Sequence, residues 1–345
     1  MVASLKQAIK DKARQLGFIL AGVTTPEPPP HYNTFLNWLA QGRHGTMAYL
    51  ASEASRARRA DLRLILPECK SILVLATPYS PPQPIGEGLE ARGNVAAYAL
   101  GDDYHEILST RMKRLISFIE EQVGGPVLNR WHTDTGPILE RDLTQGAGLG
   151  WIGKNTCLIN PRVGSYLLLS EILLDLSLEP DPPFVTDQCG TCTRCIEACP
   201  THCILPDRTL DARCCISYLT IELKEDIPLE LRSFVGNWIF GCDICQMVCP
   251  WNRFAGDGDP AFTGLTLPVL SRELSLTTQE FNHRFKQSPV KRAKRRGYLR
   301  NAAVALGNSG DPRAIPALRQ ALEDSEPMVR EHAAWAIQQI EKQSG

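Results

Sequence analysis

The feature that most constrains this chain is a run of closely spaced cysteines that begins at Cys189. The segment CGTCTRCIEACP spells C-x2-C-x2-C-x3-C-P. In this pattern three thiolates bind one [4Fe-4S] cluster and the fourth reaches a neighbouring cluster. A second group, CDICQMVCP from Cys242, spells C-x2-C-x3-C-P and is one cysteine short. Such a segment folds around an inorganic centre rather than around a hydrocarbon core.

The spacing predicts two clusters, each completed by a cysteine from the other motif. We expect the first cluster to be held by Cys189, Cys192, Cys195 and Cys249. The second would be held by Cys199, Cys242, Cys245 and either Cys214 or Cys215. Proline follows both exchanged cysteines, Cys199 and Cys249, where its ring fixes φ and removes an N–H donor. It therefore ends helical geometry and helps to turn each thiolate toward the other cluster.

Twelve cysteines in 345 residues favour metal or redox chemistry over a disulfide scaffold, because a chain of this size with 43% hydrophobic residues can build a core without staples. Zinc is the main alternative metal. Zinc sites, however, normally use two C-x2-C pairs separated by a loop. The N-terminal segment lacks an apolar stretch of signal-peptide length, and the most apolar segment is interrupted by Glu171 and Asp175. We therefore expect a cytoplasmic protein without a membrane span.

The chain divides into three expected units of an α+β protein. Residues 1–180 contain a short buried strand from Cys69, a helix over 103–123, a strand over 127–134 and a hairpin turned at Pro161 to Gly164. Residues 181–255 form the cysteine-rich unit, after a proline-rich linker. Residues 256–345 contain a linker and paired Ala/Leu helical patterns typical of an all-α HEAT-like repeat.

A basic run, KRAKRRGYLR, lies at the start of the helical repeat. Because the net charge of the chain is only -1, an anionic partner would have to be met by such a local patch. Its positive side chains could neutralise several phosphates. They are Lys291, Arg292, Lys294, Arg295, Arg296 and Arg300.

Two long motifs give the chain a family resemblance. The segments HTDTGPILERDLTQGAGLGWIGKNTCLINPRVGSYLLLSEIL and CCISYLTIE, with the cysteine array between them, resemble the epoxyqueuosine reductases over nearly the whole length. The resemblance implies an N-terminal α+β domain, of α/β type, that binds cobalamin, as in the related corrinoid reductive dehalogenases. It also implies a ferredoxin-like domain with two [4Fe-4S] clusters, and reduction of epoxyqueuosine to queuosine in the tRNA anticodon loop.

The resemblance also assigns residues. Asp134 matches the proton donor, and we expect burial beside a corrin to raise its pKa. Cys215 becomes the cluster ligand, which leaves Cys69, Cys157, Cys203 and Cys214 as ordinary thiols. His105 is expected to line the site rather than to bind cobalt. The expected cobalamin contacts are Arg59, Asp134, the backbone around Leu158 and Leu169, Ser217, Cys242 and Asp243.

Two other functions fit parts of this pattern. A ferredoxin-type electron-transfer component of a larger redox complex would need the clusters but no cobalamin. A zinc-stabilised RNA-binding scaffold would need only the cysteines, the basic run and the repeat. For the reductase we expect a monomer that receives electrons from an external donor and binds queuosine-type tRNAs through the anticodon stem-loop.

Overall fold

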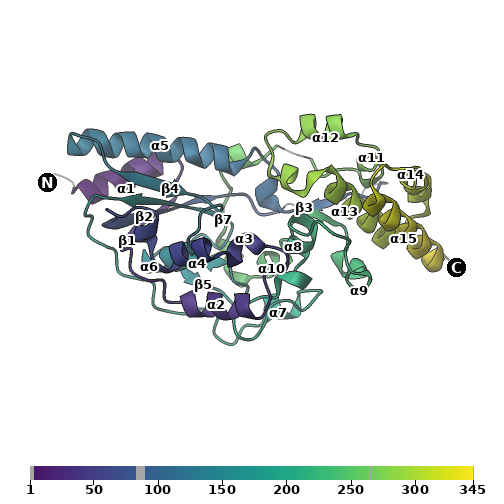
Figure 1. The fold of residues 1–345 in the computed structure, drawn as a ribbon, viewed down its shortest axis with the longest axis horizontal. Helices are drawn as coiled ribbons and strands as arrows, with labels where there is room; N and C mark the ends of the chain where they lie inside the picture. Colours follow the sequence, from purple (N-terminus) through teal and green to yellow (C-terminus); the bar gives the residue numbers. More distant parts are fainter. Residues whose placement is uncertain (1–3, 83–89, 265, 345) are drawn as a thin grey trace.

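The N-terminal part of the chain forms a four-stranded sheet with helices on both faces (Figure 1). The computed structural model describes residues 4–82, 90–264 and 266–344. The strand order is β1-β2-β7-β4, and its members are β1 (Leu20–Thr24), β2 (Ser71–Pro78), β7 (Leu167–Leu174) and β4 (Asn129–His132). All its strand pairs are antiparallel. The unit is therefore α+β, and the expected α/β type is wrong, because parallel crossovers do not build this sheet.

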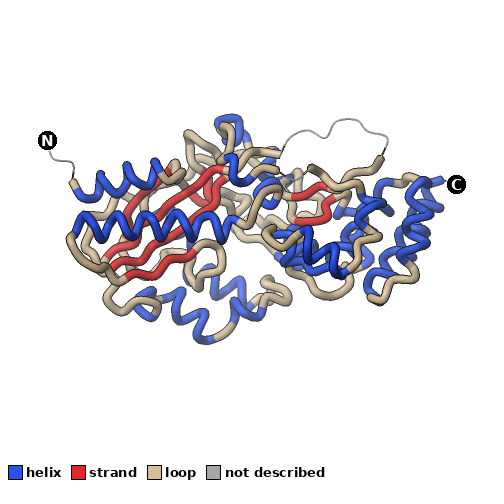
Figure 2. Tube along the Cα trace, turned by 90° about the horizontal axis from the view of Figure 1, so that it is seen from above, coloured by secondary structure: helices blue, strands red, loops and turns tan. Residues whose placement is uncertain are grey.

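Two helices cover one face of this sheet, α1 (Leu5–Gln15) and α5 (Tyr104–Val123). The side chains of Ile9, Leu75 and Met112 are buried in the core between them. The other face carries α4 (Glu53–Ala60) and α6 (Glu140–Gly146), while α2 (Tyr32–Ala40) and α3 (Ala48–Ala51) lie beyond them. The sheet thus lies between two helical layers (Figure 1), and the view from above in Figure 2 shows helices crossing over its strands.

Helix α5 confirms the helix expected over 103–123. Its N-cap Asp103 accepts a hydrogen bond from the backbone N–H of His105 at 3.0 Å. Its C-cap Gly124 has φ 75°, the left-handed conformation that closes many helices. The strands expected from Cys69 and over 127–134 are confirmed as β2 and β4.

The expected hairpin at Pro161 to Gly164 is only partly correct. A bridge between Asn160 and Gly164 closes the turn. The strand before it, β6 (Leu158–Ile159), pairs with β5 (Trp151–Ile152) instead of with β7. The apolar strand β7 has both edges occupied, because it pairs with β2 and β4 in the centre of the large sheet.

The cysteine-rich part consists of loops and short helices, as the spacing predicted. The helices are α7 (Arg194–Glu197), α8 (Ile216–Ile221), α9 (Leu229–Arg232) and α10 (Ile244–Met247). Strand β8 (Trp238–Phe240) pairs in parallel with β3 (Asn94–Val95), which ties this part to a segment of the N-terminal half.

The C-terminal part is helical (Figure 1). Its members are α11 (Leu270–Glu273), α12 (Thr278–Arg284), α13 (Lys294–Ser309), α14 (Ile315–Ala321) and α15 (Pro327–Ser344). Leu299, Ala303, Leu318 and Ala333 pack in one core that also includes Val95 and Phe240. In the described parts of the chain, no helix combines the length and the hydropathy that a membrane span requires.

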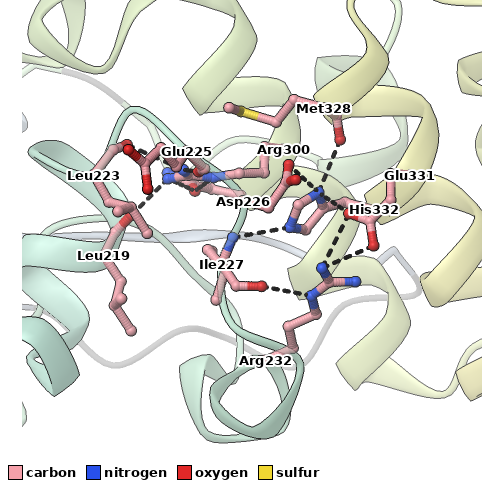
Figure 3. Close-up of polar contacts among 11 residues, drawn as sticks. Leu219, Leu223, Glu225, Asp226, Ile227, Arg232, Arg300, Met328, Glu331 and His332 are labelled. Carbon is pink, nitrogen blue, oxygen red and sulfur yellow. Dashed lines mark hydrogen bonds and ion pairs between the residues drawn. The ribbon is translucent and has the colours of Figure 1, made fainter.

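Arg300, the last cation of the basic run, is fully buried where α13 meets the cysteine-rich part (Figure 3). Its guanidinium donates to the backbone carbonyls of Leu219 at 2.5 Å and Leu223 at 3.0 Å. Arg295 forms an ion pair with Asp324 at 2.5 Å. Both arginines stabilise contacts within the fold, so our expectation that the whole run can neutralise phosphates is wrong for these two. The exposed cations of the run are Lys291, Arg292, Lys294 and Arg296.

The same junction contains an acidic and histidine cluster (Figure 3). Both ring nitrogens of the fully buried His332 have backbone partners. Nε2 accepts from the Ile227 N–H at 3.2 Å, and Nδ1 lies 2.8 Å from the carbonyl oxygen of Met328. Arg232 pairs with Glu331 at 2.9 Å. The cluster therefore joins helix α15 to the cysteine-rich part, and both ring nitrogens of His332 serve this structural role.

Candidate functional site

The first cysteine group lines one small cavity. Its wall contains Cys189, Cys192, Cys195 and Cys249, the four cysteines expected to hold the first cluster. Trp151 Nε1 donates to Cys189 Sγ at 3.5 Å, and the Trp251 ring meets the Trp151 ring edge-on at 5.1 Å. Cys249 reaches this cavity from the second motif, through the short helix α10. The crossed arrangement expected from the sequence is therefore sterically available.

The second cysteine group is more buried and contains two further thiols. Cys242 lies within electrostatic range of Cys199 and Cys215, and Cys245 lies within range of Cys242 and Cys215. These are the four ligands expected for the second cluster. Two cysteines that we expected to be ordinary thiols, Cys157 and Cys203, also lie here. The Cys203 thiol is 3.5 Å from Cys199 Sγ and contacts Cys215. Cys157 contacts Cys245. Cys69 instead packs in an apolar core beneath the sheet.

The donor set of these two groups fits iron-sulfur clusters. Thiols gather in two neighbouring groups with apolar and aromatic walls, and no disulfide ties any of the twelve cysteines. Thiolate groups of this kind are the usual ligands of [4Fe-4S] clusters. The expected zinc arrangement of two separate C-x2-C pairs does not describe them, because each group draws cysteines from both motifs.

Asp134 lies in the turn that follows β4, with 64% of its side chain exposed. The Tyr104 hydroxyl donates to Asp134 Oδ2 at 2.7 Å, and the Asp134 N–H donates to Glu140 Oε1 at 2.5 Å. The backbone of Asp134 has φ 59°. Few side chains other than Asn and Asp adopt this conformation readily, and a residue held in it often marks a functional turn. The carboxylate is therefore presented outward from a fixed position.

The neighbours of Asp134 determine the pKa of its carboxyl group. Desolvation raises the pKa of Asp134, but contacts with His105 and Tyr104 outweigh it, so the net pKa lies below the ordinary value. The expected rise in pKa concerns Asp134 beside a bound corrin, so it stays a prediction. Burial lowers the pKa of His105, yet its contacts with Asp103 and Asp134 raise that pKa to about 9. At neutral pH the proton resides on His105, which lines the site as expected.

Two more acidic side chains lie near Asp134. Burial, with the nearby Asp134 charge, raises the pKa of Glu140 to about 7. Glu171 on β7 is fully buried, and neither of its carboxylate oxygens has a hydrogen-bond partner within the described residues. Burial raises the pKa of Glu171 well above its ordinary value. His132 lies opposite Glu171 in the sheet, and its buried Nε2 likewise has no partner in the part of the chain that the structure describes.

A chain of contacts links Asp134 to the second cysteine group. The ring of Tyr104, which binds Asp134, packs edge-on against Tyr98 at 5.9 Å. The N–H of Ala97, beside Tyr98, donates to Asp243 Oδ2 at 2.7 Å. Asp243 is buried and adjoins Cys242, and burial raises its pKa to about 6. The structure therefore brings the expected proton donor and the expected Cys242–Asp243 pair to one region.

The other expected cobalamin contacts come from several elements. Arg59 on α4 is buried, lies 5.4 Å over the Phe35 ring and points Nη2 at the Gly136 carbonyl oxygen, 3.5 Å away in the Asp134 turn. Leu158 lies on β6, Leu169 on β7 and Ser217 in α8, two residues after Cys215. Arg59 and Leu169 thus both contact the Asp134 turn, because the Leu169 carbonyl oxygen accepts from the Thr133 hydroxyl at 2.7 Å. Within the described residues, Leu158 and Ser217 form no hydrogen bond with this turn.

Sequence reasoning missed several residues of this site. Tyr104, Tyr98 and Glu140 were not singled out, and Glu171 was noted only because it interrupts an apolar segment. A single acidic residue in a strand that is otherwise apolar is a usable signal, because burying it is costly unless it has a role. Nothing comparable marked the two tyrosines.

A cationic and aromatic pair lies within electrostatic range of Asp134. Arg292 from the basic run forms an ion pair with Glu222 and lies 6.0 Å over the ring of Tyr49, which is 54% exposed. The positive charge of Arg292 also acts on Asp134. The exposed end of the basic run therefore adjoins the candidate site.

Comparison with known proteins decides the family. Curated epoxyqueuosine reductases match nearly full length: the one from Pseudomonas aeruginosa is 41% identical, covering 97% of this chain and 94% of the relative, and the one from Escherichia coli is 38% identical, covering 99% and 91%. The chain belongs to the epoxyqueuosine reductase family. Members of this family are oxidoreductases.

Family models and solved structures agree with this assignment. The model described as epoxyqueuosine reductase QueG, DUF1730, matches residues 59–135, a 4Fe-4S double cluster binding domain matches 188–252, and HEAT repeats match 293–344. A crystal structure of an epoxyqueuosine reductase with an epoxyqueuosine-modified tRNA-Tyr stem loop has a TM-score of 0.88 at 30% identity, covering 97% of this chain and 90% of that one. The expected cluster-binding and HEAT-like parts are confirmed at this level.

Proposed function

We propose that this chain reduces epoxyqueuosine to queuosine in tRNA, with cobalamin as the reactive centre, two [4Fe-4S] clusters as its electron supply and Asp134 as the proton donor. The observation that carries the proposal is the contact chain from Asp134 through Tyr104, Tyr98 and Ala97 to Asp243, beside Cys242. This chain of contacts supports the proposal, because it connects the proposed proton donor with the thiols that would hold the nearer cluster. A structure of the Bacillus subtilis enzyme is described with an aspartate-bearing catalytic loop swung out of the active site, which supports the role of the Asp134 turn.

The residues around Asp134 fit a large group with polar edges. Buried polar atoms without partners in the described residues include His105 Nε2, His132 Nε2 and both carboxylate oxygens of Glu171. Cobalamin carries amide side chains that can satisfy such atoms. Arg59, the backbone at Leu158 and Leu169, Ser217, Cys242 and Asp243 would hold it. When bound, it would supply a strongly reducing metal centre able to attack the epoxide.

The protein's own groups perform the proton chemistry. Removing the epoxide oxygen as water breaks two C–O bonds, forms the alkene and consumes two electrons and two protons. Asp134 is exposed toward the site, and Tyr104 fixes the carboxylate oxygen that would give the proton. A positioned carboxylic acid acts only in its protonated form. Desolvation by a bound corrin and substrate would raise the pKa of Asp134 toward that form.

Electrons would enter from an external donor at the first cysteine group. Cys249 borders both the first cavity and an open surface cavity that is lined also by Arg194, Met247 and Arg253. Met247 is 56% exposed there. We infer that this surface receives the donor, that the second group passes electrons inward, and that the protein works in the cytoplasm as a monomer.

The test is an anaerobic reaction of the reconstituted protein with cobalamin, dithionite and epoxyqueuosine-containing tRNA. Nucleoside analysis by mass spectrometry should show queuosine, one oxygen atom lighter than its precursor, and iron analysis should give about eight irons per chain. Bound clusters without retained cobalamin or product would favour an electron carrier. Zinc in place of iron would favour the RNA-binding scaffold.

The anionic substrate should be bound by the exposed part of the basic run. The double variant Lys294→Ala/Arg296→Ala removes two exposed cations of α13, so we expect weaker tRNA binding and a salt slope smaller by about 1–2. Filter binding between low and moderate salt measures both. The matched control Arg114→Ala/Arg130→Ala removes two exposed cations on α5 and β4. Equal losses in both double variants would show that only net charge matters.

A further inference from the structure

In the proposed reaction, the second of the two protons has no source so far. The departing oxygen needs two protons to leave as water, whereas one carboxylic acid holds a single proton. Asp134 must therefore be reprotonated within each turnover. This inference rests on the proposed function and concerns the source of the proton that returns to Asp134.

His105 lies where it can transfer a proton to Asp134. Its Nδ1 lies 2.7 Å from Asp103 Oδ1, and its Nε2 lies 3.7 Å from Asp134 Oδ2. Nε2 is buried and has no hydrogen-bond partner among the residues that the structure describes. The imidazole ring stacks on Tyr104 at 4.1 Å, and the Tyr104 hydroxyl binds the same Asp134 oxygen. The ring is thus held on two sides with its unused nitrogen toward the carboxylate.

Asp103 fixes this arrangement from the start of α5. Its Oδ1 also accepts the backbone N–H of His105 at 3.0 Å, so the helix cap and the ring are held by one oxygen. A carboxylate on Nδ1 orients the imidazole and makes its protonated form more stable. The Asp103 and His105 side chains are 29% and 31% exposed, so solvent protons can reach them.

The surrounding charges keep the proton on His105 at rest. The carboxylates of Asp103 and Asp134 outweigh desolvation and raise the pKa of His105 to about 9, while Asp134 has a pKa below its ordinary value. Glu140, the Tyr104 hydroxyl and the Arg292 charge also act on Asp134. The pair therefore holds one mobile proton, which resides on the histidine until the carboxylate is required to donate it.

We propose that His105, oriented by Asp103, is a positioning residue that transfers its Nε2 proton to Asp134, so that Asp134 delivers both protons of the reaction in succession. In each transfer the Nε2–H bond breaks and an O–H bond forms on Asp134, which then gives that proton to the substrate oxygen. Neutral His105 keeps its Nδ1–H toward Asp103 and regains a proton from solvent at Nε2, the atom that lost it. The two electrons come from the external donor through the clusters.

The test is a pH profile of turnover in the holoenzyme, with dithionite as donor. Because the protonated imidazole is the active form, wild-type kcat should hold below about pH 9 and fall above it. His105→Gln should lower kcat by about tenfold or more, leave the KM for tRNA within about twofold and remove that alkaline limb. His283→Gln on α12, an exposed histidine, is the matched control. An unchanged kcat and alkaline limb in His105→Gln overturns the proposal.

A second measurement does not depend on activity. NMR titration of histidine-labelled full-length protein should give His105 a pKa of about 9, and a lower pKa in Asp103→Asn.

A third measurement uses turnover: added imidazole should restore turnover to His105→Ala. An ordinary pKa for His105 in the wild type, or no rescue, contradicts the relay. A wild-type protein that makes no queuosine would instead defeat the proposed function itself.

Discussion

Replacing Asp134 by Asn is expected to lower turnover on epoxyqueuosine-tRNA by about 10²–10⁴-fold. The amide has the same shape and can still accept the Tyr104 hydroxyl through its oxygen. Asn also tolerates the backbone φ of 59°, so the turn and its N–H bond to Glu140 should persist. What is lost is the O–H that would give a proton to the epoxide oxygen. Single-turnover kinetics at neutral pH, with product nucleosides measured, checks the expectation.

The control for this variant is its cofactor content. Iron per chain should equal that of the wild type, since Asp134 is not among the proposed cluster ligands. Cobalamin should also be retained, because Asn keeps the shape of Asp134 at its expected cobalamin contact. Asp102→Asn, which changes an exposed aspartate two residues before Tyr104, should leave turnover unchanged. Wild-type turnover in Asp134→Asn would remove the acid role from this residue. Loss of cobalamin would give it a binding role instead.

The parts of the fold that could be predicted are those with a strong local signal. Helix α5 has a capping aspartate, a terminal glycine and apolar residues at helical spacing, so its bounds agree with the sequence. The two cysteine groups could likewise be predicted, because their members are separated by only two or three residues within each motif. The partner of β6 was missed because a tight turn between two apolar segments does not specify pairing: the long strand β7 gains more by pairing with both β2 and β4.

The candidate site was predicted unevenly for a similar reason. Asp134 and the cysteines lie in motifs, whereas Tyr104, Tyr98 and Glu171 reach the site through tertiary packing. The basic run shows the opposite error. Arg300 and Arg295 have the charge of a phosphate-binding residue. Within the fold, however, Arg300 binds backbone carbonyl oxygens and Arg295 pairs with Asp324, and both contacts are distant in sequence. Charge along the sequence does not reveal such burial.

Replacing Cys249 by Ala is expected to remove the first cluster, although Cys249 belongs to the second motif. Its side chain lines the cavity of Cys189, Cys192 and Cys195. Loss of one thiolate from a four-thiolate set should therefore lower iron from about eight to about four per chain. The second group keeps its own four cysteines, so an electron paramagnetic resonance signal from one reduced cluster should remain. Turnover should fall strongly, because the donor's electrons would lose their point of entry.

The matched control is Cys214→Ala, beside the proposed ligand Cys215. Cys214 is partly exposed, and it is Cys215 that contacts the Cys203 thiol in the second group. Cys214→Ala should therefore retain both clusters, whereas Cys215→Ala should lose the second one. Retention of all iron in Cys249→Ala, or loss of the second cluster in place of the first, would contradict the crossed ligand sets. Each motif would then hold its own cluster, with Cys199 rather than Cys249 completing the first.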